Sequence, residues 1–80
     1  MIKFLYSIQD NLTGFGEPFV CENDSVAMRI VRQAANESSS LYFSPDDFKL
    51  WKIGTYDTKN GSLVGTMEHI CDIDSLIIKE

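Results

Sequence analysis

Apolar and polar residues alternate at the start of the chain. Every second residue over Ile2–Ile8 is apolar, and this period of two predicts a β-strand over residues 2–9. A turn-rich segment follows at residues 10–16. Residues 18–21 then predict a short second strand, which begins with a proline where a missing N–H group is tolerated. The two strands predict an N-terminal hairpin.

The next segment has the spacing of an amphipathic helix. Its apolar residues recur at separations of three and four, which is the period of a helix with one buried side. Asn23 or Asp24 is suited to cap its start. The apolar stripe consists of Val26, Ala27, Ile30, Val31, Ala34 and Ala35. The helix is expected to end at residues 36–37, and the serine run 38–40 is predicted to be a loop.

Four further elements complete the pattern. Pro45 suits the first position of a helical turn, and the pair Asn60–Gly61 favours a tight turn between two strands. In chain order, a helical turn, a long strand, its return strand and a helical tail are predicted over residues 44–47, 48–57, 62–71 and 72–78. The predicted fold is therefore α+β. It is a single domain, residues 1–80, with a small antiparallel sheet of order ββαββ packed on one helix and a short C-terminal helical segment.

The strand over residues 48–57 is apolar on both sides. The two sets of side chains are Phe48, Leu50 and Tyr56 on one side, and Trp51 and Ile53 on the other. One helix covers only one face of a sheet, so the second face requires the C-terminal tail, another subunit or a ligand. A domain this small also has a thin core, which favours a homodimer. The predicted interface contains Trp51, Ile53 and Leu5.

The charge balance limits the partners. Seven Lys and Arg stand against twelve Asp and Glu, which argues against strong non-specific nucleic-acid binding. Arg29 and Arg32 nevertheless lie three apart on the predicted helix, outside the apolar stripe and without an acidic residue three or four positions away. Two interpretations are open. Either they pair with distant acids such as Asp46, Asp47 or Asp57, or they form a small phosphate-binding patch.

Two lysines on the long strand extend the second interpretation. Lys49 and Lys52 lie close to Trp51, and charge interleaved with an aromatic ring suits a base or a backbone phosphate. Trp51 equally suits a core or a dimer interface. We predict that any nucleic-acid contact runs through Arg29 and Arg32, helped by Lys49 or Lys52.

Catalytic, metal and cofactor sites are not predicted. The one histidine, His69, lies in a predicted strand without a nucleophile motif, and the adjacent acids at residues 46–47 are explained by helix capping. Cys21 and Cys71 lack metal-binding spacing. The N-terminus has no signal-peptide pattern, and no apolar run is long enough to span a bilayer. We therefore expect free thiols, an intracellular protein without membrane contact, and neither a cofactor, a small-molecule substrate nor enzymatic activity.

Several motifs together resemble one protein family. They are Leu5-Tyr6-Ser7-Ile8-x-Asp10, Phe15-Gly16-x-Pro18-Phe19, Asn23-Asp24-x-Val26-Ala27-x-Arg29, Pro45-x-Asp47-Phe48-x-Leu50-Trp51-x-Ile53-Gly54-x-Tyr56-Asp57 and Gly61. The combination resembles the small nonstructural protein of gokushoviruses, a microvirus subfamily of single-stranded DNA phages. Residues 62–80 depart from the family's pattern. Arg29 matches that pattern, whereas Arg32 and Lys52 are proposed on local grounds.

The resemblance implies a phage nonstructural protein with a DNA-linked role. Such proteins are associated with switching genome replication toward single-strand synthesis for packaging. The implied location is the host cell cytoplasm, outside the virion. We therefore expect a non-enzymatic protein that binds single-stranded DNA or a phage or host replication protein. The competing expectation is a protein-interaction or scaffolding adaptor that never contacts nucleic acid.

Overall fold

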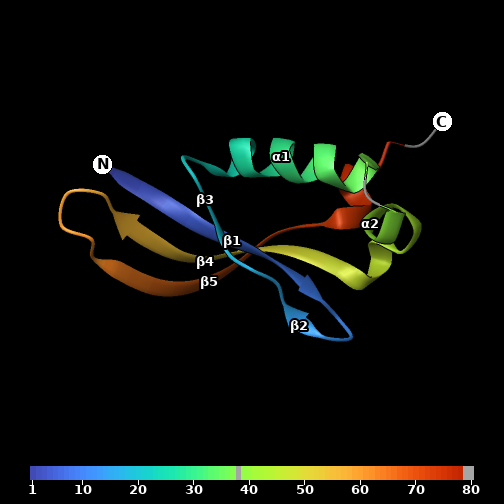
Figure 1. Ribbon diagram of the computed structural model, residues 1–80, viewed down its shortest axis with the longest axis horizontal. Helices are drawn as coiled ribbons and strands as arrows, with labels where there is room; N and C mark the ends of the chain where they lie inside the picture. Colours follow the sequence, from blue (N-terminus) through green and yellow to red (C-terminus); the bar gives the residue numbers. More distant parts are fainter. Residues whose placement is uncertain (38, 79–80) are drawn as a thin grey trace.

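One antiparallel sheet carries helices on one of its sides (Figure 1). The structure is a computed structural model that describes residues 1–37 and 39–78. The strands are β1 (Ile2–Asp10), β2 (Gly14–Phe15), β3 (Phe19–Cys21), β4 (Phe48–Asp57) and β5 (Leu63–Asp72). The helices are α1 (Asp24–Glu37) and α2 (Ser39–Phe43), with single 3-10 turns η1 (Pro45–Asp47) and η2 (Ile73–Leu76). The predicted α+β class is confirmed.

The N-terminal strand lies inside the sheet, and all its pairings are antiparallel. β1 pairs with β4 along one edge, and with both β2 and β3 along the other. The return strand predicted over residues 18–21 is β3, and β2 is a further short strand within the segment 10–16 that was predicted to be a turn. Pro18 lies between them and has no N–H group to donate to β1, so the ladder is interrupted there.

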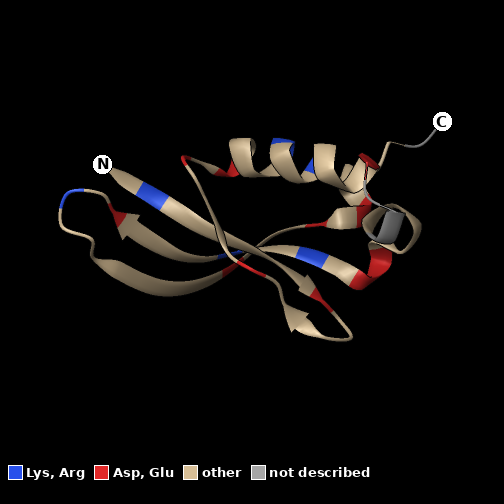
Figure 2. Cartoon of the chain, viewed as in Figure 1, with Lys and Arg blue, Asp and Glu red and all other residues tan. Residues whose placement is uncertain are grey.

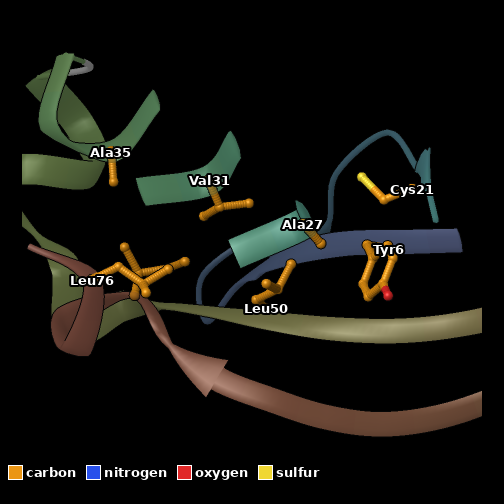
Figure 3. Close-up of a cluster of buried hydrophobic side chains, with 8 residues drawn as sticks. Tyr6, Cys21, Ala27, Val31, Ala35, Leu50 and Leu76 are labelled. Carbon is orange, nitrogen blue, oxygen red and sulfur yellow. The ribbon is translucent and has the colours of Figure 1, made fainter. Parts of the chain in front are cut away.

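The core forms where α1 lies on the sheet (Figure 3). Asn23 caps the helix, since its Oδ1 accepts a hydrogen bond from the Val26 amide at 2.9 Å. The buried positions of α1 are spaced by four and point at the sheet; they are Ala27, Val31 and Ala35. The broader predicted stripe is wrong at two positions, because Ile30 is 47% exposed and Ala34 is exposed. These residues precede the buried ones by one, so they lie at the rim of the contact.

The C-terminal tail covers the same side of the sheet as α1. Ile73 and Leu76 in η2 are buried in one cluster with Leu50 and Val31. Their spacing of three matches the 3-10 turn, which presents both side chains in one direction. The predicted tail helix is thus shorter than expected and of the 3-10 type. Up to residue 78, the tail does not cover the other side of the sheet.

The serine run was predicted to be a loop, and that prediction is wrong where the chain is described. Ser38 lies outside the described residues, but Ser39–Phe43 forms α2. Leu41 in α2 packs against the core cluster. Burial of this leucine stabilises a short helix that the serines alone disfavour.

A β-bulge at Ile53 changes the pattern of β4. The pairing of β4 with β1 shifts by one residue at this point, and a bulge reverses which residues share a face. Beyond it, Tyr56 pairs with Lys3, on the side of the sheet away from α1. The prediction that Tyr56 shares a side with Leu50 is therefore wrong.

Candidate binding surfaces

Arg29 and Arg32 are exposed on α1, whose acidic residues lie at its two ends (Figure 2). Within the described residues, neither guanidinium has a carboxylate at ion-pair distance. The described residues therefore do not contain the pairing of these arginines with distant acids that was one interpretation of the sequence. Both line an open depression of about 340 Å³ beside the C-terminal tail, together with Ser25, Met28 and Leu76.

A third cation lies near this pair and was not predicted from the sequence. Lys3 and Arg29 both line a depression of about 300 Å³ between β1, β3 and α1. Lys3 belongs to the first strand, so no local spacing links it to the helix. We call Lys3, Arg29 and Arg32 the basic row.

Lys52 is held by two carboxylates. Its Nζ lies 3.1 Å from Asp24 Oδ1 and 3.2 Å from Glu68 Oε2, and its side chain is only 16% exposed. The same Nζ lies 4.5 Å above the ring of Phe4. Burial alone lowers the pKa of Lys52, but the hydrogen bonds to Asp24 and Glu68 outweigh that effect and raise the pKa. A phosphate would have to displace both acids to reach this lysine.

Tyr6 completes the arrangement around Asp24. Its hydroxyl donates to Asp24 Oδ1 at 2.6 Å, and burial, followed by this bond, raises the pKa of Tyr6. Burial acts to raise the pKa of Asp24 as well. The hydrogen bonds from Tyr6 and Lys52 act in the opposite direction and leave the pKa of Asp24 below its ordinary value. This network fixes the start of α1 on the sheet, so its role is structural.

Lys49 lies on the other side of the sheet from Arg29 and Arg32. It precedes Leu50, which is buried beneath α1, and successive strand residues point to opposite faces. Its direct partners across the strands are Gln9 and Asp72. The four residues predicted from the sequence therefore do not form one surface. Arg29 and Arg32 lie together, while Lys49 and Lys52 are separate from them.

The side of the sheet away from α1 has no covering element within the described residues. Directly paired residues share a face, so the register identifies its side chains. We call this surface the open face, and its main apolar side chains are Leu5, Phe15, Val20, Trp51, Leu63 and Met67. Two of the three residues predicted to form an interface, Leu5 and Trp51, lie on it. The third, Ile53, is half-buried at the bulge.

An aromatic row crosses the open face at Trp51. The Trp51 ring contacts Phe15 at 6.3 Å and His69 at 5.4 Å between centroids, both edge to face. Its Nε1 donates to Gln9 Oε1 at 2.8 Å. His69 Nε2 in turn lies 2.9 Å from Asp72 Oδ1. This row joins β2, β1, β4 and β5, and it holds the indole in one orientation.

The remaining reactive groups do not gather into a site. Cys21 is buried and Cys71 is half-buried, both as free thiols, and burial is the first cause of the raised pKa of each. Across residues 1–37 and 39–78, no three His, Cys, Asp or Glu side chains lie close enough together to hold a metal ion. The same part of the chain contains no helix with the length and apolar character needed to cross a membrane.

Comparison with known proteins gives one match. A family model described as Phage ORF5 protein matches residues 3–76. No curated protein and no solved structure matches the chain. The match begins at the second residue of β1 and ends with η2, so it includes α1, the basic row and the open face.

Proposed function

Because this chain belongs to the Phage ORF5 protein family, we propose that it is a non-enzymatic phage accessory protein that binds single-stranded DNA through the basic row. The resemblance of its motifs to the gokushovirus nonstructural protein supports a single-stranded DNA phage as its source. The same resemblance supports a part in the switch to single-strand genome synthesis. Its site of action is then the host cytoplasm, outside the virion.

The observation that carries the proposal is the pair of arginines without carboxylate partners. The chain has twelve acidic residues, so many carboxylates are available as partners for an exposed arginine. Arg29 and Arg32 have none at ion-pair distance in the described part of the chain, and they share one depression. Guanidinium groups three apart on a helix lie close enough to contact neighbouring phosphates of one strand. Lys3 adds a third cation at the other end of the row.

The expected binding is weak and sensitive to salt. A net charge of −5 repels DNA at long range, so the affinity is expected to be micromolar or poorer. For single strands, each phosphate neutralised contributes a slope of about −0.7 in log affinity against log salt. Between 50 and 200 mM salt, affinity should fall about 7-fold for two cations and about 20-fold for three.

The test is fluorescence anisotropy of a labelled thymidine oligonucleotide at these two salt concentrations. Arg29→Ala/Arg32→Ala should abolish the signal without changing the fold, because neither side chain belongs to the core. Lys49→Ala/Lys59→Ala is the matched control, since it removes the same charge from positions away from the basic row. It should bind nearly as the wild type does, as should Arg29→Lys/Arg32→Lys.

Two results would overturn this assignment. Equal loss of binding in the two alanine double variants would show that net charge alone, rather than the basic row, decides affinity. No binding by the wild type at low salt would leave the adaptor function, with a replication-linked protein as partner. Apolar docking of a protein need not weaken as salt rises, so the same titration against candidate phage or host replication proteins separates the two.

A further inference from the structure

The open face has the character of an interface that lacks its second half. Half-exposed apolar side chains lie on it from the edge strands, with Val20 at 50%, Met67 at 57% and Phe15 at 48% exposed. More central side chains, Leu5 and Trp51, are half-buried. A sheet face of this composition normally packs against a second layer, and α1, α2 and η2 all lie on the opposite side (Figure 1).

The polar groups around Trp51 on this face are already paired within the chain. Trp51 Nε1 is bonded to Gln9, and His69 Nε2 to Asp72. Ser7, also on this face, is fully buried and donates from Oγ to the Gly16 carbonyl oxygen at 2.8 Å. An apolar surface can therefore cover these groups without leaving a donor unpaired, which is the main cost of burying polar atoms.

The charge on the open face also sets it apart. Its strand positions carry Lys3, Lys49 and Asp72 as the only ionised side chains, whereas the whole chain has a net charge of −5. Two copies meeting through a surface with several acidic side chains would bring like charges together. Through the open face, by contrast, they approach with little like-charge repulsion.

The size of the face fits a second copy. Its three long strands, β1, β4 and β5, have 9, 10 and 10 residues, which is roughly 30 Å at about 3.3 Å per residue, and four strands about 4.8 Å apart span roughly 15 Å. A face of these dimensions is of the order that one sheet of a two-sheet sandwich presents to the other. A short peptide would cover only part of it.

We propose that a second copy of this chain packs its open face against this one, so that two sheets form a β-sandwich with the helices outside. The contact is isologous, with Trp51 near its centre in both copies. Arg29 and Arg32 then lie toward the two outer surfaces of the dimer, whereas Lys3 lies on the open face. This inference does not depend on DNA binding, and its test contains no DNA.

Two substitutions on the same strand provide the test. Met67 and Val64 in β5 are each 57% exposed, but Met67 lies on the open face whereas Val64 lies on the other, where it pairs with Thr55. Sedimentation velocity between about 1 and 100 µM should show a dimer for the wild type and for Val64→Lys. Met67→Lys should weaken the dimer at least about 10-fold, because a charge would be buried without a partner.

The single tryptophan reports the same event independently. Trp51 is the only tryptophan, so its emission maximum should shift to longer wavelength as the wild type is diluted into the monomer range. Met67→Lys should show the shifted emission at all concentrations. Circular dichroism confirms that both variants are folded, as expected for substitutions at exposed positions.

Three outcomes would overturn the proposal. The first is a wild-type monomer at 100 µM. The second is equal weakening by Met67→Lys and Val64→Lys, which would indicate pairing through the free edge of β5. The third is Trp51 emission that responds to an added oligonucleotide and not to protein concentration, which would assign the open face to nucleobases.

Discussion

Replacing Lys52 with methionine should destabilise the protein and leave its DNA affinity unchanged relative to a charge-matched control. Methionine keeps an apolar stem against Phe4 but removes the charge shared by Asp24 and Glu68. Glu68 is 56% exposed and Asp24 43% exposed, so solvent screens both pairs. Hydrogen bonds to charged groups contribute about 1.5–3 kcal/mol when buried, and exposed pairs about 0–1 kcal/mol. Between these limits, we expect a loss of about 1–2 kcal/mol.

Thermal and pH measurements give this prediction two signatures. For a domain of this size, each kcal/mol shifts Tm by about 4–8 °C, so Lys52→Met should melt roughly 5–15 °C lower. The pKa of Asp24 is lowered in the folded state. Ionised Asp24 therefore stabilises the folded state above its unfolded pKa near 4, and this stabilisation is lost as pH falls below that pKa. The difference between wild type and variant should shrink toward pH 3.

Lys59→Met is the control for this experiment. Lys59 is exposed in the turn between β4 and β5, so the variant has the same net charge as Lys52→Met without losing the network around Asp24. It should change stability by less than about 0.5 kcal/mol. The two variants should bind the oligonucleotide equally. An unchanged Tm for Lys52→Met, together with a loss of DNA binding as large as that of the double arginine variant, would refute the reasoning.

Three further predictions follow from the network, the bulge and the thiols. Tyr6→Phe should lower the free energy of unfolding by about 1–2 kcal/mol at neutral pH. Because the pKa of Tyr6 is raised in the folded state, the protonated hydroxyl stabilises the fold below the unfolded pKa near 10, and this stabilisation is lost as pH rises above that value. Above about pH 10 the urea midpoint of the variant should therefore fall less steeply than that of the wild type, and parallel curves would contradict this. Gly54→Ala places a Cβ 2.9 Å from the Val64 carbonyl oxygen, so it should lower the free energy of unfolding by about 1–3 kcal/mol in a denaturant titration. Gly65→Ala is the control, because its Cβ would have no atom within 4 Å and should not cause this loss. Equal losses in the two variants would argue against the close approach. In maleimide labelling, Cys21 should react more slowly than Cys71, because Cys21 is buried and its thiol reacts only after local opening of the fold. The reverse order of reactivity would show that β3 opens readily.

Elements with a strong local pattern could be predicted from the sequence. The strand over residues 48–57 agrees at both ends with β4, because its apolar run is bounded by a helical turn and by the Asn60–Gly61 pair. Gly61 has a positive φ of 75°, whereas Asn60 does not, so the turn is longer than the two-residue type that the Asn-Gly pair favours. The helix was also located correctly, since a period of three and four has no alternative interpretation over that length.

Features that depend on distant residues could not be predicted. The bulge at Ile53 has no local signal, because it depends on the register that β1 imposes on β4. Lys52 was expected to contact phosphate, but its acidic partners come from α1 and β5. Lys3 was overlooked as a cation near Arg29 for the same reason. Sequence spacing identifies which side chains share an element, but not which elements meet.

The central position of β1 has a consequence for how the chain folds during synthesis. β1 leaves the ribosome before the strands that pair with it, and one of its edges has no partner until β4 has been made, because Ile8 pairs with Leu50. At about 5–20 residues per second, this interval lasts about 2–8 s. During that time the nascent chain exposes an unpaired strand edge, which is a site of misassociation and of chaperone binding. The rate of translation, rather than the strength of any one contact, therefore sets how long the first strand remains exposed.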